Sequence, residues 1–214
     1  MTAIEYLTLD VPDPALAKDF YDAAFGLDNS IRLRLSNAPT AGFRGFTLSL
    51  TVSQPSTVNS LVDAAVAGGA STLKPAAKSF WGYGGVVQAP DGTIWKIATS
   101  AKKDNGPATR EIDDIVLLLG VADVKATKRF YAERGLGVKR SFGGKYAEFE
   151  AAPGAVQLAI YPRRALEKET GVAVDPAAAY GIMLGGGSEA FTDPDGFTWQ
   201  AGDHGTHDRD EHDR

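Results

Sequence analysis

Seven side chains in this 214-residue chain could bind a flat organic molecule. Aromatic rings provide apolar walls with polar tips, and a guanidinium group pairs with an anionic group. The seven candidates are Tyr6, Arg44, Phe46, Trp81, Tyr83, Trp95 and Tyr146. Trp81 and Tyr83 stand in a glycine-rich run rather than in a periodic strand, a setting in which binding residues are common. The alternative is that the rings fill a core under a curved sheet and that Arg44 lies on an exposed strand face.

Residues suited to metal or nucleophilic chemistry are scarce. The chain has no cysteine, and its three histidines, His204, His207 and His212, all lie in the last 12 residues. A Ser-His-Asp arrangement is not expected, because no histidine elsewhere could act as the base. Two histidines three residues apart could hold a metal adventitiously, but the nearby glycine and charges favour a solvated terminus. Glu148, Glu150 and Gln157 remain as candidate oxygen ligands, and either glutamate could act as a base.

The composition narrows the class of partner. The net charge is −5, of which −3 belongs to residues 203–214, so no basic stripe and no binding of nucleic acid are expected. No apolar run approaches the roughly 20 residues of a membrane span. The N-terminus lacks the basic-then-apolar pattern of a signal peptide, which predicts a cytoplasmic protein without a membrane partner.

An internal repeat organises the chain. Residues 89–96 read Ala-Pro-Asp-Gly-Thr-Ile-Trp-Lys, and residues 193–200 read Asp-Pro-Asp-Gly-Phe-Thr-Trp-Gln. Proline presets φ and glycine supplies a positive φ, so both copies predict tight hairpin turns. Residues 4–21 and 114–131 form a second matched pair, each with a Val-x-Asp step and a later Phe-Tyr pair. Two landmarks in the same order indicate a duplication.

The repeat divides the chain into regions. We predict a first domain over residues 1–99, a linker over 100–112, a second domain over 113–202 and a disordered acidic tail over 203–214. Units 43–99 and 114–161 approach a full strand–helix–three-strand pattern. Units 1–36 and 179–202 look truncated.

Periodicity predicts the elements that must position the candidate residues. Helices are expected after Asp13, with Leu16, Phe20 and Ala24 on one face, from Ser56 or Thr57 to Gly68, and again after Asp123. A short helical piece is expected between residues 162 and 178, and a loop over 80–85. The main predicted strands cover residues 4–11, 31–35, 43–52, 72–74, 86–88, 94–98, 137–142, 145–150, 155–161 and 180–184.

These signatures resemble the vicinal oxygen chelate superfamily, which includes glyoxalase I, extradiol dioxygenases and bleomycin-type resistance proteins. The matching residues are the Val-x-Asp, Phe-Tyr and Gly-Leu steps and the Pro-Asp-Gly turn. The resemblance implies an α+β fold with two tandem glyoxalase-like domains built from βαβββ modules, two of the four modules being truncated. The sheets are expected to curl around a cleft.

The resemblance also implies where metal ligands would stand. Metal-chelating members take a histidine from the first strand, ahead of the Val-x-Asp step, and a glutamate from the strand after the turn. Here the first position is Tyr6 or Val116, and the second is Lys96 or Gln200. Thr47 stands where a further ligand could lie. Valine cannot bind a cation, a lysine ammonium repels it, and the amide oxygen of Gln200 is a weak ligand.

Three hypotheses follow from these residues. The first is a metal-independent binding protein without a cofactor, for a small aromatic or amphipathic molecule, with drug sequestration as its concrete form. The second is a glyoxalase, isomerase or dioxygenase with an unconventional metal site that uses Glu148 or Glu150. The third is a scaffold without a ligand. A homodimer is left open, because truncated modules leave sheet edges that a second subunit could cover.

Overall fold

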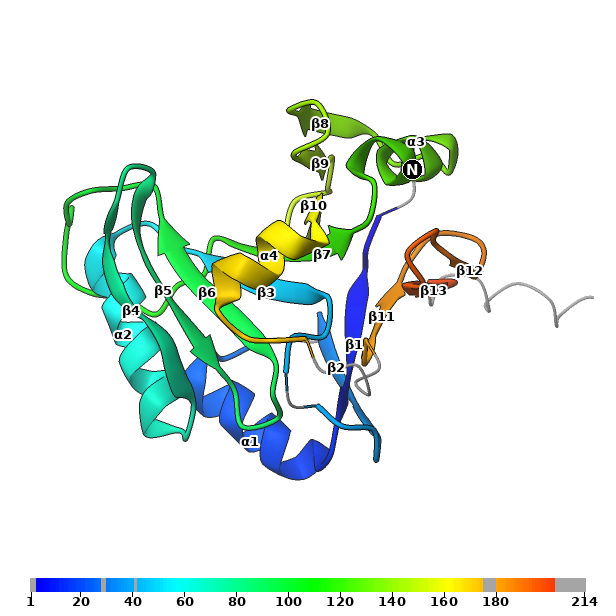
Figure 1. The fold of residues 1–214 in the computed structure, drawn as a ribbon. Helices are drawn as coiled ribbons and strands as arrows, with labels where there is room; N and C mark the ends of the chain where they lie inside the picture. The colour runs from blue at the N-terminus through cyan, green and yellow to red at the C-terminus, as the bar shows by residue number, and fades with distance from the viewer. Residues whose placement is uncertain (1–2, 28–29, 41, 175–179, 203–214) are drawn as a thin grey trace, which may run out of the picture.

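The computed structural model describes residues 3–27, 30–40, 42–174 and 180–202. These residues form four helices and thirteen strands, and the strands make up two sheets (Figure 1). The first half of the chain contains β1 (Tyr6–Val11), α1 (Pro14–Ala24), β2 (Ile31–Leu35), β3 (Phe46–Thr51), α2 (Pro55–Ala67), β4 (Ser71–Ser79), β5 (Gly82–Gln88) and β6 (Ile94–Thr99). The second half contains β7 (Asp114–Val121), α3 (Val124–Glu133), β8 (Val138–Ser141), β9 (Ala147–Phe149), β10 (Gln157–Pro162), α4 (Arg163–Thr170), β11 (Ile182–Gly185), β12 (Phe191–Thr192) and β13 (Thr198–Gln200).

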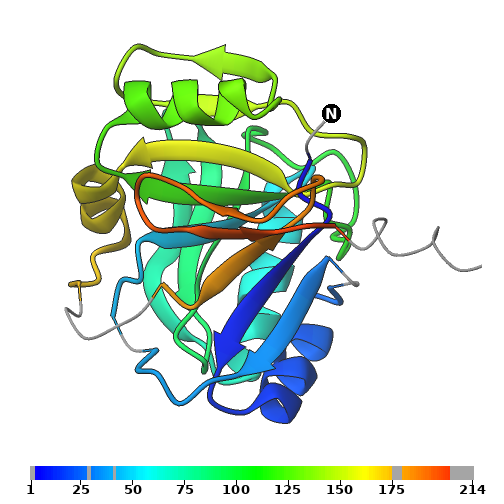
Figure 2. The same cartoon turned by 90° about the vertical axis from the view of Figure 1, so that its right-hand side faces the viewer.

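The two sheets combine strands from both ends of the chain. The smaller sheet has the order β12-β13-β11-β1-β2, and the larger has the order β4-β5-β6-β3-β7-β10-β9-β8. The outer units of the sequence therefore share one sheet, and the two fuller inner units share the other, joined where β3 runs antiparallel to β7. Figure 2 shows β1 beside β11, its antiparallel partner. The domain boundaries at residues 99 and 113 stay predictions.

Local signals in the sequence explain how the repeated helices begin. The Asp13 carboxylate accepts hydrogen bonds from the backbone N–H groups of Ala15 (2.9 Å) and Leu16 (3.1 Å). Asp123 caps α3 in the same way, through Lys125 and Ala126. Each cap satisfies N–H groups that have no partner within the helix, so both predicted starts are confirmed.

Both Pro-Asp-Gly hairpins form as predicted. Gly92 has φ +86° between β5 and β6, and Gly196 has φ +94° between β12 and β13. Trp95 and Trp199 follow these turns and are fully buried. The core also takes one side of β3, where the predicted alternating residues Phe46, Leu48 and Leu50 are buried.

Several local predictions are wrong. Leu16 is 68% exposed, because α1 buries Ala17, Phe20, Tyr21 and Ala24 instead. β4 covers residues 71–79 rather than 72–74. Residues 82–85, expected as a loop, pair with it as the start of β5. Strand pairing outweighs the loop propensity of the glycines there.

The region between the halves is held to α2. Gln54 stands at the N-cap of α2, so this helix begins before Ser56. Its side-chain amide donates to the Pro107 carbonyl (2.6 Å) and accepts from the backbone N–H groups of Asn105 and Gly106. No helix in the described part of the chain is long and apolar enough to cross a bilayer.

Candidate ligand groove on the eight-stranded sheet

The eight-stranded sheet has one face against α2 and another that meets α4. Along β3, Phe46, Leu48 and Leu50 point into the core shared with α2, so Thr47, Ser49 and Thr51 lie on the opposite face. The same alternation on β6 buries Trp95 and Ile97 and places Lys96 and Ala98 on that opposite face. We call it the α4 face.

Helix α4 covers part of the α4 face. Leu166 is 1% exposed and belongs to a small cluster with Phe43, Val86 and Ile94. One turn earlier, Arg163 Nε donates to the Gly120 carbonyl of β7 (3.0 Å). One turn later, Glu169 accepts from Lys96 Nζ (2.8 Å). Three contacts at a spacing of three residues hold one side of α4 against the sheet.

Beside α4 the sheet is left open as a groove of about 760 Å³, lined by residues of β3 to β7 and by Glu169. Its floor has small side chains, because Gly84, Ala98 and Thr51 are neighbours in register across β5, β6 and β3. A Cβ atom on Gly84 would lie 3.0 Å from the Ala98 Cβ, so both residues face the groove. The missing side chains create the hollow.

Charged groups border the groove in both signs. The Lys96–Glu169 ion pair closes one end, and both side chains are partly exposed, at 45% and 38%. Asp113 and Asp114 lie at the β7 side. Burial, followed by the negative charges of Asp114 and Glu111, raises the pKa of Asp113. The groove therefore offers a flat apolar floor with hydrogen-bonding groups around its edge.

Two of the seven candidate binding residues border this groove. Trp81 stands at the rim, 82% exposed, and packs edge-on against Phe80. Tyr83 also borders it, while its hydroxyl donates to Asn59 Oδ1 of α2 (2.9 Å). The Tyr83 ring packs against the core on the α2 side of the sheet, so its hydroxyl does not point into the groove.

The other five candidates lie elsewhere. Trp95 and Phe46 are buried in the core, and the Tyr6 ring is covered by the Arg32 guanidinium, 3.3 Å from its centroid. Arg44 is 4% exposed and donates to Thr93 Oγ1 (2.7 Å) and to the Asp10 carbonyl (3.2 Å). Burial lowers the pKa of Arg44.

Tyr146 contributes to a separate polar cluster on β8 and β9. Its hydroxyl donates to Glu148 Oε2 (3.1 Å), and burial with the Glu148 charge raises the pKa of Tyr146 to about 12. Glu148 also pairs with Lys139 (2.9 Å) and Arg140 (3.7 Å). These partners occupy the carboxylate that the enzymatic hypothesis needs as a base or a ligand. Its alternative, Glu150, is exposed.

The expected ligand positions pair across the two halves of the chain. Lys96 and Val116 are both register partners of Ser49, so they share one row on the α4 face. In the smaller sheet, Tyr6 and Gln200 are both partners of Gly185. The first row offers an ammonium already bound to Glu169, a valine and a hydroxyl. The second offers a phenol stacked on Arg32 and a single amide.

Neither row is a suitable donor set for a divalent cation, because a carboxylate or imidazole is needed where the first row has an ammonium and a valine and the second has a phenol and a neutral amide. In the described ranges, no three His, Asp or Glu residues are grouped closely enough to hold a metal. The three histidines lie outside these ranges. The chemistry of both rows thus disagrees with the metal site that the resemblance implied.

A buried Tyr-Asp-Trp contact occurs in both copies of the repeat. Tyr131 donates to Asp193 Oδ2 (2.6 Å) and accepts from Trp199 Nε1 (3.3 Å). Tyr21 makes the equivalent contacts with Asp91 (2.5 Å) and Trp95 (3.4 Å). Burial, reinforced by the neighbouring carboxylate, raises the pKa of both tyrosines well above the usual value.

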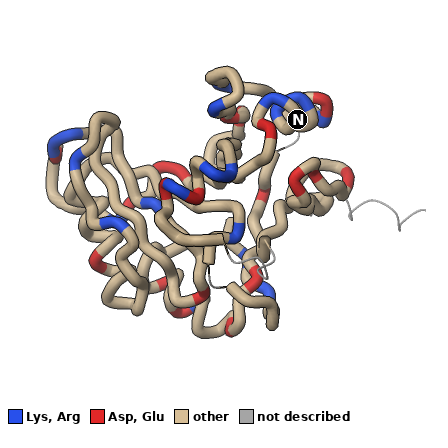
Figure 3. Tube along the Cα trace, in the orientation of Figure 1, with Lys and Arg blue, Asp and Glu red and all other residues tan. Residues whose placement is uncertain are grey.

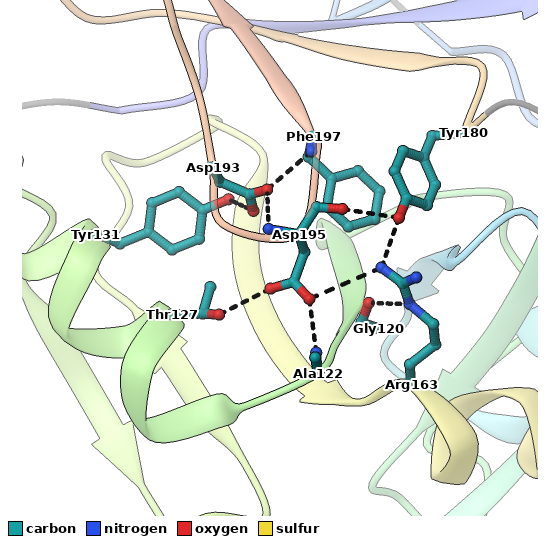
Figure 4. Close-up of polar contacts among 9 residues, drawn as sticks. All are labelled: Gly120, Ala122, Thr127, Tyr131, Arg163, Tyr180, Asp193, Asp195 and Phe197. Carbon is teal, nitrogen blue, oxygen red and sulfur yellow. Dashed lines mark hydrogen bonds and ion pairs between the residues drawn. The ribbon is translucent and has the colours of Figure 1, made fainter.

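The aspartate in this contact comes from a different position of the turn in each copy of the repeat. Asp91 precedes Gly92 directly, whereas Asp193 lies three residues before Gly196. Asp195, the true counterpart of Asp91, accepts instead from Ala122 N (2.6 Å) and Thr127 Oγ1 (2.9 Å), as Figure 4 shows. The sequence repeat alone did not reveal this exchange.

Sequence reasoning also missed the role of α4. The signal was available: Arg163, Leu166 and Glu169 recur at a spacing of three, which places them on one side of a helix. An apolar residue between two charged ones on that side predicts a helix anchored at its centre and held by polar contacts at its ends.

No protein-family model matches the chain, and no curated protein sequence matches it. Solved structures do. Glyoxalase I from Zea mays aligns with a TM-score of 0.64 at 14% identity, over 94% of this chain and 92% of that one. A putative dioxygenase from Bacillus subtilis aligns with a TM-score of 0.58 at 10% identity, over 93% of this chain and 84% of that one.

These superpositions establish the fold, but sequence identities this low leave the activity open. The α+β architecture expected from the repeated signatures is confirmed by these neighbours and by the two sheets. The chain has the fold of the vicinal oxygen chelate superfamily.

Proposed function

We propose that this protein binds a small aromatic or amphipathic molecule in the groove on the α4 face and that it does so without a metal ion. Sequestration of a planar compound, such as a drug, is the concrete form of this activity. The observation that carries the proposal is the open floor of Gly84, Ala98 and Thr51 in a hollow of about 760 Å³. A flat ring can lie directly on a backbone surface that lacks large side chains.

The borders of the groove suit such a ligand. Trp81 stands at the rim, where its exposed indole could cover one face of a bound ring. The Lys96–Glu169 pair and Asp114 could bind polar groups at the edge of the ring. The existence of this hollow favours binding over the scaffold hypothesis. The ion pairs that occupy Glu148 make the enzymatic hypothesis the weaker one.

Filling the groove is expected to weaken binding strongly without unfolding the protein. Ala98→Phe places a ring on the floor, whereas Ala23→Phe adds the same ring at an exposed site on α1. With 8-anilinonaphthalene-1-sulfonate as a flat amphipathic probe, titration followed by fluorescence should give at least about tenfold weaker binding for Ala98→Phe. Ala23→Phe should stay within about twofold of wild type. Equal binding by all three proteins would show that the probe does not use the groove.

Metal independence has a separate test. The melting temperature of the protein is measured with Mg²⁺, Mn²⁺, Ni²⁺ and Zn²⁺, each alone and then with the probe. The proposal expects probe binding to be unchanged by every metal and by chelator. Stabilisation by one divalent ion at a one-to-one ratio, lost in a Gln200→Ala variant, would contradict it and would place a metal in the smaller sheet.

A further inference from the structure

Positive charge is concentrated in one segment of this acidic protein. Residues 124–145 contain seven lysines and arginines and a single acid, a net charge of +6. The whole chain carries −5, so all other residues together carry −11. The expectation that no basic stripe exists was wrong, because a net charge summed over the chain conceals its distribution.

The fold brings most of these charges to one end of the molecule. Helix α3 and the β8–β9 hairpin lie together at one end of the molecule, where Figure 3 shows Lys and Arg along both elements. Lys128 Nζ donates to Ser141 Oγ of β8 (3.2 Å). A Cβ atom on Gly144, in the hairpin turn, would lie 3.7 Å from Lys125 Cε. The basic face consists of Lys125, Lys128, Arg129 and Lys145, with Lys139 and Arg140 on the adjoining strand β8. Arg134 instead lies over the rings of Phe130 and Phe191.

Only part of this charge is neutralised internally. Glu148 pairs with Lys139 and Arg140. Among the residues that the structure describes, no ion pair reaches Lys125, Arg129 or Lys145, and all three are exposed. Lys125 and Arg129 are four residues apart on α3, where like charges repel each other. An external anionic group would relieve this repulsion.

The basic face also presents an exposed aromatic ring. Phe142, beside the hairpin turn, is 59% exposed and leans against Tyr146. The turn also carries the unpaired cation Lys145, whose backbone N–H donates to the Phe142 carbonyl (3.1 Å), so it offers an apolar contact as well as charge. This combination fits a partner that carries acidic residues beside an apolar one.

We propose that the basic face docks an acidic segment of a partner protein, with an apolar side chain of that segment against Phe142. The ten residues of α3 span about 15 Å, which matches four or five residues of an extended partner. A polynucleotide is a poorer fit, because its affinity comes from neutralising many phosphates, and two of the cations at this end are already paired with Glu148. The −11 carried by the other residues would also repel a long polyanion or an anionic bilayer.

Charge reversal on the basic face tests the proposal. The probe is a fluorescein-labelled decapeptide of Glu and Asp with one central Leu, and binding is followed by fluorescence anisotropy at 150 mM NaCl. The double variant K125E/R129E should bind at least about tenfold more weakly than wild type. The matched control K102E/K103E changes the same net charge between the halves and should stay within about twofold. Phe142→Ser should weaken the Leu peptide more than a peptide with Ser in its place.

Three results would overturn this assignment. Equal weakening by both double variants would show a response to net charge alone. Tighter binding of oligo-dT or of phosphatidylserine vesicles than of the peptide would assign the face to another class of partner. No peptide binding at millimolar concentration, with the fold intact by circular dichroism, would remove the proposed partner altogether. None of these outcomes bears on the groove, which lies on other strands.

Discussion

Replacing Gly92 with alanine is expected to cost about 3–4 kcal/mol of unfolding free energy, whereas the same change at Gly196 should cost about 1–2 kcal/mol. Both glycines close the same Pro-Asp-Gly turn, with φ +86° and +94°. An alanine pays the conformational penalty of a positive φ at either site. The difference lies in what surrounds each turn.

At Gly92 the added methyl group would stand 2.1 Å from the carbonyl oxygen of Thr40 and 2.8 Å from its carbon. These are backbone atoms, so the chain near Thr40 must move as a unit. At Gly196 the nearest atom is Cε2 of the Tyr180 ring, at 3.1 Å. A ring edge can yield by a few tenths of an ångström. Steric overlap is therefore severe in one copy of the repeat and mild in the other.

Urea denaturation of the two single variants measures both costs under identical conditions. Because the substitutions are chemically the same, the penalty of a positive φ cancels in their difference, which isolates the overlap with Thr40. A difference below about 0.5 kcal/mol would mean that the segment around Thr40 adapts freely. The close approach would then not hold that segment against the turn.

The repeated signatures made the overall architecture predictable. The aspartate caps of α1 and α3 and the Pro-Asp-Gly turns depend on residues close in sequence, so their physics can be read locally. Alternation along β3 correctly predicted which residues face the core. The wrong secondary-structure predictions came where pairing with a distant strand decides the conformation. Residues 82–85 are an example, because their glycines favour a loop until β4 pairs with them.

The candidate site was harder to predict because it depends on which strands are neighbours. Lys96 and Val116 come from different halves and share a row only because β3 lies between β6 and β7. The groove floor depends on the small size of Gly84 and Ala98, whereas the sequence prediction of binding residues selected large aromatic side chains. Trp95 was a candidate by residue type, yet the register that places Lys96 on the α4 face must turn Trp95 into the core.

The second large effect is expected at Tyr131. Tyr131→Phe removes the hydrogen bond to Asp193 and the acceptor of the Trp199 indole N–H, both in the core. Two buried polar groups lose a partner at about 1–3 kcal/mol each, which predicts a loss of about 2–6 kcal/mol at pH 7. Cavity formation adds little, because phenylalanine retains the ring.

The loss should depend on pH in a defined direction. Burial raises the pKa of Asp193 in the folded protein, and the hydrogen bond from Tyr131 partly offsets this by favouring the charged form. Without that bond the folded pKa rises further above the unfolded value of about 3.9. A group with a raised folded pKa stabilises the protein fully below its unfolded pKa, and this contribution is lost as pH rises through the folded pKa. The deficit of Tyr131→Phe should therefore be smaller at pH 4 than at pH 7.

Tyr21→Phe is the matched control in the other copy, since its hydroxyl makes the equivalent bonds to Asp91 and Trp95. Guanidinium denaturation of wild type and both variants at pH 4 and pH 7 gives four differences in unfolding free energy. We expect both variants to be destabilised at pH 7. A Tyr131→Phe deficit that is equal at the two pH values would show that Asp193 keeps its protonation state without the tyrosine. The backbone N–H groups of Asp195 and Phe197, which also donate to Asp193, would then suffice to hold its charge.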